Sequence, residues 1–313
     1  MSGQQCRLTL WRPCSRIALV ALFGGVTGFA LANDKDAASQ CPEHYTARPP
    51  LLVNARLQVK TRELCSRMFA VLHSGLTRTP LYAAERLTRV NIGSAQEQVR
   101  YNDFHPDSRL PADERAELRD YARSGFDRGH LAPSGDMPDI DAQQESFALS
   151  NMIPQNPRNN RYLWSGIETT TRMLAKRLGS LFVVTGTIYS GSDLQSIGNG
   201  VVVPTHIYKA LYDPATGETA AYVVANDDSR RYATIDLRTL ERLSGVRVFP
   251  SRQVGGRHME LPTPAQRGSK GELYERVSYA LLFGGAAGAI RASPDKTPAT
   301  SARDSTKPRR FAE

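Results

Sequence analysis

Residues 124–133 read Ser-Gly-Phe-Asp-Arg-Gly-His-Leu-Ala-Pro, so an acid, a guanidinium and an imidazole crowd around one glycine. Side chains of these kinds rarely gather for packing alone. Hydrolysis of a phosphodiester needs a base that deprotonates water, and His130, with an ordinary pKa of about 6.5, suits that task. Arg128 would place positive charge beside the phosphate. Gly129 would let the backbone approach a ligand closely.

This motif alone has a second interpretation. In an ordinary surface loop, Asp127 and Arg128 would pair with each other and His130 would be an inert imidazole. A second polar cluster about twenty residues downstream favours the chemical interpretation. It runs Leu149-Ser150-Asn151-Met152-Ile153-Pro154-Gln155 and continues through Asn160, Trp164 and Glu168. A strand, a turn and the start of a helix would place these polar groups beside the strand that carries His130.

The two clusters together resemble the DNA/RNA non-specific endonuclease family, which includes secreted bacterial nucleases and mitochondrial endonuclease G. Asp127-Arg128-Gly129-His130 matches the family's signature, and the downstream cluster matches its second half with the spacing kept. The resemblance covers roughly residues 69–250. It implies an α+β protein with the ββα-metal (His-Me finger) endonuclease fold, in which helices flank a central mixed or antiparallel sheet.

The resemblance also implies the main catalytic roles. His130 is expected to be the general base and Asn160 the direct ligand of Mg²⁺, or of another divalent cation such as Mn²⁺. Arg128 is expected near the phosphate, and Glu168 is expected to hold water bound to the metal. The metal would stabilise charge on the leaving oxygen. Because Asn159 adjoins Asn160, the ligand assignment stays open by one position.

Two further residues are weaker candidates for substrate contacts. Arg86 corresponds loosely to a family arginine that contacts phosphate, and an ordinary surface arginine is the alternative. Asn151 is either a substrate contact or an amide that supports the site from behind.

Hydrophobic patterns predict a mixed α+β domain without internal repeats. We expect strands at residues 68–73, 80–88, 147–153, 181–189, 201–212 and 219–224, where apolar and β-branched side chains cluster. Leucine and isoleucine at spacings of three and four residues predict a helix over residues 161–178.

The two ends of the chain look different from the middle. Arg7, Arg12 and Arg16 precede an apolar run and the sequence Ala30-Leu31-Ala32, which together predict a signal peptide over residues 1–32. We therefore expect a secreted or periplasmic protein without a membrane anchor after cleavage. Residues 33–67 would form an N-terminal arm, residues 68–290 the nuclease domain, and residues 291–313 a disordered basic tail.

Cleavage of the signal would remove two of the four cysteines and leave Cys41 and Cys65. In an oxidising compartment these two are expected to form a disulfide, with two free thiols as the alternative. The sequence contains no Cys-x-x-Cys pair, which argues against a redox motif or a cysteine-bound zinc.

Composition agrees with a polyanionic partner. The chain holds 40 Lys and Arg against 31 Asp and Glu, a net charge of +9 that loss of the three signal arginines would lower to +6. A phosphate-binding Gly-x-x-x-x-Gly-Lys loop and a His-Glu-x-x-His motif are both absent. The favoured function is hydrolysis of DNA and RNA without sequence or sugar preference; the alternative is a non-catalytic nucleic-acid-binding protein that keeps the nuclease fold. Formation of a homodimer is left open.

Overall fold

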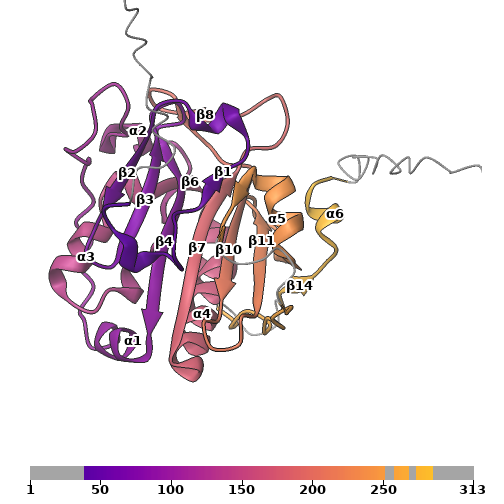
Figure 1. Cartoon of the computed structure of the whole chain (residues 1–313). Coiled ribbons are helices and arrows are strands. Elements are labelled where there is room, and N and C mark those ends of the chain that lie inside the picture. Colours follow the sequence, from indigo (N-terminus) through magenta and orange to yellow (C-terminus); the bar gives the residue numbers. More distant parts are fainter. Residues whose placement is uncertain (1–38, 251–256, 268–272, 285–313) are drawn as a thin grey trace, which may run out of the picture. The chain divides into compact units, whose positions relative to one another are not determined.

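The framework of the computed structural model is an eight-stranded sheet, seen edge to edge in Figure 1. The structure describes residues 39–250, 257–267 and 273–284. The strand order is β14-β12-β11-β10-β7-β4-β3-β2, and all neighbours are antiparallel except β12 and β14. The strands are β2 (Thr61–Cys65), β3 (Phe69–Ser74), β4 (Thr79–Thr88), β7 (Ser180–Ile188), β10 (His206–Tyr212), β11 (Thr219–Ala225), β12 (Arg231–Ile235) and β14 (Glu275–Arg276).

Smaller strand pairs lie outside this sheet. In the described part of the chain these pairs are β1 (Leu51–Leu52) with β13 (Val246–Arg247), β5 (Asp127–His130) with β6 (Met152–Gln155), and β8 (Ser196–Ile197) with β9 (Val201–Val202). All three pairs are antiparallel.

Helices cover both faces of the sheet. The α-helices are α1 (Arg89–Ala95), α2 (Leu118–Tyr121), α3 (Ile140–Ser146), α4 (Ser165–Leu178), α5 (Leu237–Ser244) and α6 (Tyr279–Leu282). Short 3₁₀ turns are η2 (Pro42–His44), η3 (Ala55–Gln58), η4 (Ser134–Asp136) and η5 (Leu149–Asn151), and a π-helical turn, η6 (Asn159–Trp164), leads into α4.

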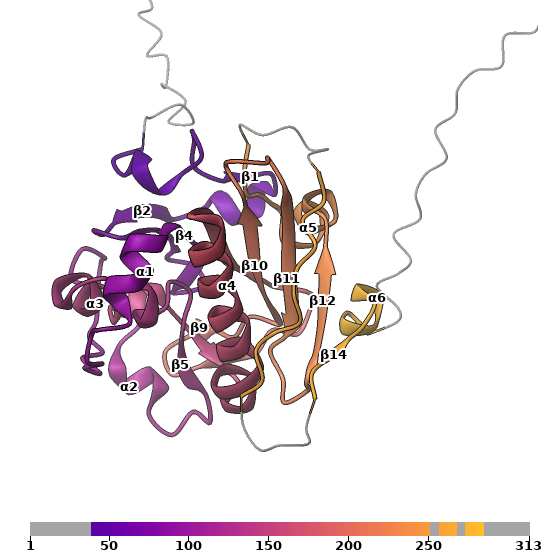
Figure 2. The same ribbon diagram turned by 90° about the horizontal axis from the view of Figure 1, so that it is seen from below.

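The core lies in two layers because successive strand residues point to opposite faces. Val183 on β7 packs with Ile167 of α4 in one buried cluster, whereas its neighbour Val184 packs with Leu240 of α5 in the other. Figure 2 shows α4 running along its face of the sheet. This packing fixes the position of α4, and α4 carries part of the candidate site.

The predicted fold class is confirmed, and two of the predicted strands need correction. The stretch 147–153 is not a strand: it contains η5, and the strand β6 begins only at Met152. Its apolar side chains are buried in a loop, which mimics a strand pattern. The predicted strand 201–212 is divided into β9 and β10 around Pro204, which has no N–H for a ladder. The predicted helix 161–178 is present as the end of η6 and α4.

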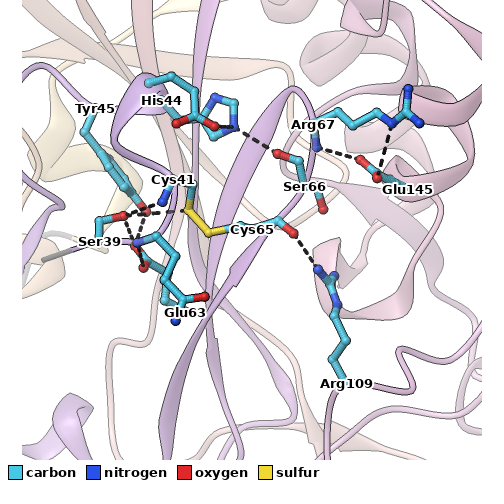
Figure 3. The surroundings of a disulfide bond; sticks show 12 residues. Ser39, Cys41, His44, Tyr45, Glu63, Cys65, Ser66, Arg67, Arg109 and Glu145 are labelled. Carbon is cyan, nitrogen blue, oxygen red and sulfur yellow. Dashed lines mark hydrogen bonds and ion pairs between the residues drawn. A yellow bond between two sulfur atoms is a disulfide. The ribbon is translucent and has the colours of Figure 1, made fainter. Parts of the chain in front are cut away.

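The predicted disulfide joins Cys41 and Cys65, whose Cα atoms are 5.6 Å apart (Figure 3). It ties the segment before β1 to the end of β2. Because β2 lies within the predicted N-terminal arm, residues 33–67, the sheet extends into that arm. Close by, Tyr45 donates to the Glu63 carboxylate at 2.8 Å, and Arg109 donates to the Cys65 carbonyl at 2.7 Å. Glu63 and the two sulfurs lie near one another. They do not form a metal site, because the sulfurs are bonded to each other and are not thiolates.

Removal of this disulfide should lower the melting temperature. In the chain-entropy model the cross-link is worth about 3 kcal/mol, which corresponds to a drop of roughly 6 to 12 °C in a protein of this size. Calorimetry on a variant with Cys41→Ser and Cys65→Ser measures the drop. Reductant should lower the melting temperature of the parent and leave the variant unchanged. Equal melting temperatures for parent and variant would contradict the prediction.

The predicted signal peptide (1–32) and basic tail (291–313) lie outside the described residues. None of the helices in the described ranges is long and apolar enough to cross a lipid bilayer.

Candidate active site

The strands β5 and β6 form a two-stranded ribbon in which His130 faces Met152. Shortly after β6 the chain enters η6 and continues as α4. Two strands followed by a helix give the ββα arrangement expected from the sequence. The π-helical turn at its junction is a rare element that occurs frequently at functional sites.

A cavity of about 390 Å³ collects four of the predicted site residues: Arg128, His130, Asn160 and Glu168. They come from β5, η6 and α4, which are separate in sequence. The remaining lining residues are Arg100, Asp127, Pro133, Ser134, Gly135, Arg161, Ser165 and Arg172. We call this cavity the catalytic pocket.

His130 is held between aromatic rings at the end of β5. It is 7% exposed, and its ring centre lies 5.0 Å from that of Phe147 and 5.7 Å from that of Phe104. Its buried Nε2 atom has no hydrogen-bond partner among the described residues. Burial, aided by the positive charge of Arg100, lowers the pKa of His130 to about 3. The side chain is therefore neutral at neutral pH, and the ordinary pKa assumed from the sequence is wrong.

Asp127 organises the start of the helix. Its carboxylate accepts a hydrogen bond from Nδ2 of Asn160 at 3.0 Å and two from Arg161, at 2.9 and 2.7 Å. Asp127 therefore pairs with Arg161. The surface-loop interpretation required it to pair with Arg128 instead. The bond to Asn160 uses the amide nitrogen, so the amide oxygen is the ligand atom that Asn160 would offer.

Asn159 faces a different environment from its neighbour. It is 1% exposed, and its amide accepts from Gln155 at 2.8 Å and donates to the Ala225 carbonyl at 3.0 Å. It does not line the catalytic pocket. Of the two adjacent asparagines, the structure brings only Asn160 to the pocket.

Glu168 shares the pocket with Arg172, which forms an ion pair with the buried Asp136. Arg172, one turn further along α4, donates to Asp136 at 2.8 Å. Burial raises the pKa of Glu168, and the charges of Arg172 and Lys209 act against that rise. The neighbouring cations favour the carboxylate form of Glu168, and a carboxylate can accept hydrogen bonds from the water of a hydrated metal ion.

Asn151 does not reach the catalytic pocket. It is fully buried, its Nδ2 donates to the carbonyls of Ala132 and Ser146 at 2.9 Å, and its Oδ1 accepts from the Ala132 N–H at 3.0 Å. These bonds clamp the chain just after His130. The side chain is therefore engaged in supporting the strand, and it lies outside the lining of the catalytic pocket.

Arg86 also lies away from the catalytic pocket. It is an exposed residue of β4, its guanidinium sits 5.4 Å from the centre of the Phe182 ring, and its Nε donates to Ser180 at 3.3 Å. Neighbouring strand residues point to opposite faces, and in β4 the buried side chain at this point is Glu85, the residue before Arg86.

Gly129 has a different task from the one expected. A Cβ atom at this position would collide with the Gln155 side chain across the ribbon. Glycine is therefore required by the packing of β5 on β6, not by a ligand.

The comparisons with known proteins agree with this geometry. The model of the DNA/RNA non-specific endonuclease family matches residues 51–254, more than half of the chain. The chain belongs to the DNA/RNA non-specific endonuclease family. The predicted enzyme class, a hydrolytic nuclease, is confirmed at the level of this family.

Several family members are similar over the same region. Identity is 32% over 205 residues with mitochondrial nuclease 1 of Schizosaccharomyces pombe, covering 58% of this chain and 64% of the relative. It is 33% over 203 residues with mitochondrial nuclease EXOG of Xenopus laevis, covering 58% and 56%. It is 32% over 214 residues with human mitochondrial endonuclease G, covering 62% and 70%. The match thus spans less than two thirds of the first two relatives.

A solved structure gives the same result for the fold. The chain is similar to one in the crystal structure of an EndoG/EndoGI complex, with a TM-score of 0.53 and 25% identity, over 61% of this chain and 88% of that one.

These family members correct the predicted location. The three relatives named above are mitochondrial nucleases, and they point to mitochondria, not to a secreted or periplasmic protein. The sequence misled because arginines without acidic residues occur in mitochondrial targeting segments as well as in secretory signals. Arg7, Arg12 and Arg16 therefore do not distinguish the two.

The sequence missed two residues that shape the catalytic pocket. Arg100 lines it and lowers the pKa of His130, and Phe104 packs against the His130 ring. Both lie in an irregular segment before α2, and neither belongs to the two motifs described above. Their role depends on how that segment folds back, which no local pattern encodes.

A buried charge pair in the sheet, between Lys209 and Glu85, could have been predicted from the sequence. Lys209 lies 3.9 Å from Glu85 and donates to Thr185 at 2.6 Å, and both charged residues are at most 1% exposed. Each is a charged residue inside an otherwise apolar strand, and such residues are rarely buried without a partner. That signal was available in the sequence.

The donor atoms of the catalytic pocket fit a hard divalent cation. Asn160 would offer an amide oxygen, and Glu168 offers carboxylate oxygens, which are the atoms that Mg²⁺ prefers. Among the described residues, no three His, Cys, Asp or Glu side chains of the pocket lie close enough together to hold a metal by themselves. The residues of the pocket therefore fit a cation that keeps most of its bound water molecules.

Proposed function

We propose that this protein is a magnesium-dependent endonuclease that hydrolyses phosphodiester bonds of DNA and RNA without sequence preference. His130 is the general base, Asn160 the direct metal ligand, and Glu168 the carboxylate that holds water of the hydrated ion. Mn²⁺ is the natural substitute for Mg²⁺, because both ions take oxygen ligands.

One observation carries the proposal: a neutral histidine with an unpartnered Nε2 shares a pocket with an amide, a carboxylate and several arginines. Buried polar atoms normally have hydrogen-bond partners. Because this nitrogen has none among the described residues, it is suited to accept a hydrogen bond from water or substrate. The arginines Arg100, Arg128 and Arg161 supply the positive charge that a phosphodiester requires.

The residues divide the reaction between them. His130 accepts one proton of a water molecule as the water oxygen forms a bond to phosphorus, and the ester P–O bond opposite then breaks. Arg128 donates hydrogen bonds to the phosphate oxygens, whose charge grows in the transition state. A cation bound by Asn160 would stabilise the charge on the leaving oxygen, which finally takes a proton from solvent.

A closed circular plasmid provides the direct test, because only an endonuclease can cut it. Full-length protein should nick and linearise the plasmid and degrade RNA in the presence of Mg²⁺ or Mn²⁺, and EDTA should stop both reactions. Binding without cleavage under all metal conditions would overturn the proposal and favour the non-catalytic nucleic-acid-binding protein.

The low pKa of His130 predicts an unusual pH profile. A base accepts a proton only when neutral, and with a pKa of about 3 His130 is neutral throughout the physiological range. We expect kcat/KM to show no acid limb near pH 6.5, and a loss through His130 only as the pH falls toward 3. Initial rates at constant ionic strength and saturating magnesium, from pH 7.5 downward, measure the profile.

Arg100→Gln provides the matched variant for this profile. Loss of the positive charge removes one of the two causes of the low pKa, so the acid limb should move to higher pH. Circular dichroism at each pH separates this effect from acid unfolding. An acid limb near pH 6.5 in the parent enzyme would show that the histidine is not held neutral as described.

A further inference from the structure

Residues 257–267, which we call the C-terminal strap, run from the sheet to the helix α4. The match to the family model ends at residue 254, so the strap lies beyond it. At its start, the N–H of Thr219 in β11 donates to the Arg257 carbonyl at 2.9 Å. Near its end, the N–H of Ala265 donates to Oγ1 of Thr170 in α4 at 2.8 Å. The strap therefore reaches the helix that forms part of the catalytic pocket.

The strap is packed firmly against α4. Its side chains Met259 and Leu261 are buried in the same cluster as Ile167 of that helix. A Cβ atom at Gly166 would collide with the Ala265 carbonyl oxygen, so glycine at this position permits the close approach of the two backbones. Both observations give the strap a fixed position on the first half of α4.

Arg267, at the end of the strap, is held at both its backbone and its side chain. Its N–H donates to the Tyr274 hydroxyl at 3.1 Å, and that hydroxyl lies 3.2 Å from the Arg267 carbonyl. Its guanidinium donates to Oγ1 of Thr169 at 2.7 Å. The same oxygen accepts from Arg172 at 3.2 Å and donates to the Ser165 carbonyl at 2.9 Å. One threonine hydroxyl thus fixes two guanidinium groups side by side.

Only one of these two positive charges is compensated within the protein. Arg172 lines the catalytic pocket and pairs with Asp136 at 2.8 Å. Arg267 is exposed, does not line that pocket, and forms no ion pair with a carboxylate among the described residues. Neighbouring guanidinium groups repel each other, and an anion bound beside them relieves that repulsion. Phosphate is the anion whose geometry a guanidinium matches with paired hydrogen bonds.

We propose that Arg267 binds a backbone phosphate of the nucleic acid beside the one that is cleaved. The inference rests on the proposed function and adds a substrate contact to it. Contacts with phosphate carry no base information, so this contact is compatible with cleavage of duplexes and single strands at any sequence. Because Thr169 and Tyr274 already hold the residue in place, little conformational freedom is lost when the phosphate binds.

The salt dependence of binding tests this contact. Each phosphate contact adds about 0.9 to the slope of log affinity against log salt on duplex DNA, so Arg267→Ala should reduce the slope by about that amount. Affinity at low salt should fall by roughly 2- to 10-fold, as for the loss of one exposed charge pair. Fluorescence anisotropy with labelled duplex DNA in EDTA, with full-length protein over a series of salt concentrations, measures both. Arg267→Lys keeps the charge and should keep most of the slope.

Arg257→Ala is the matched control, because it removes the same charge from the end of the strap that is joined to β11. Its slope should stay parental. An unchanged slope in Arg267→Ala, or an equal reduction in Arg257→Ala, would overturn the inference. If only Arg267→Ala lowers the slope but the parent cuts no plasmid with any metal ion, the proposed function fails and the phosphate contact stands. Melting curves verify folding, and Arg267→Gln replaces an alanine variant that does not fold.

Discussion

His130→Ala should lower turnover by a factor on the order of 100 to 10,000, the usual contribution of a positioned general base. The substitution removes the nitrogen that takes the proton of water and leaves Asn160 and Glu168 in place. Affinity for the metal should therefore persist. Plasmid nicking measures turnover, and titration calorimetry with Mn²⁺ measures metal binding.

Two controls separate loss of the base from damage to the fold. His258→Ala removes an exposed histidine outside the catalytic pocket and should behave as the parent. Imidazole added to His130→Ala should restore part of the activity, because the substitution leaves space beside Phe147 and Phe104 for the same chemical group. If His130→Ala degrades plasmid at the parental rate under saturating magnesium, the signature motif has only a structural role.

Local sequence predicted the parts of the site that depend on short spacing. The Asp127–His130 strand, the return strand and the helix lie within about forty residues. The family resemblance assigned His130, Asn160 and Glu168 to one site, and strand register and helical period are local enough to bring them together. The same reasoning placed α4 through Leu163, Ile167 and Leu174, which are all buried.

Contributions from distant segments were not predictable in this way. Arg100 reaches the catalytic pocket from a segment without regular structure, and its effect on His130 is electrostatic. Burial caused the largest change, since the pKa of a histidine depends on how completely Phe104, Phe147 and the rest of the fold exclude water. An isolated motif contains no information on either quantity.

The three asparagines near the site also show what a local sequence pattern leaves undecided. Asn151, Asn159 and Asn160 carry the same side chain and lie within ten residues, and the sequence left two questions open: whether Asn159 or Asn160 is the metal ligand, and whether Asn151 contacts substrate. The structure separates them by partner and place: Asn151 and Asn159 bond only within the protein and do not line the catalytic pocket, whereas Asn160 donates through its nitrogen to Asp127 and lines that pocket. Hydrogen-bond partners, not residue type, decide which amide is available to a ligand.

Asn160→Ala should therefore lower both metal affinity and turnover, because it removes the only direct protein ligand that we propose for the ion. Raising the magnesium concentration should restore part of the activity of this variant, whereas it should not restore His130→Ala. The apparent metal constant comes from initial rates over a magnesium titration, supported by calorimetry with Mn²⁺.

Asn159→Ala is the matched control, since it changes the same residue type one position away. Its loss breaks the bonds to Gln155 and Ala225, so we expect a free energy of unfolding lower by about 1 to 3 kcal/mol. The magnesium dependence of the folded enzyme should stay parental. Weaker metal binding in Asn159→Ala with a parental constant in Asn160→Ala would move the ligand by one residue. Parental apparent metal constants in both variants would exclude both amides as the ligand and leave Glu168 as the residue to test.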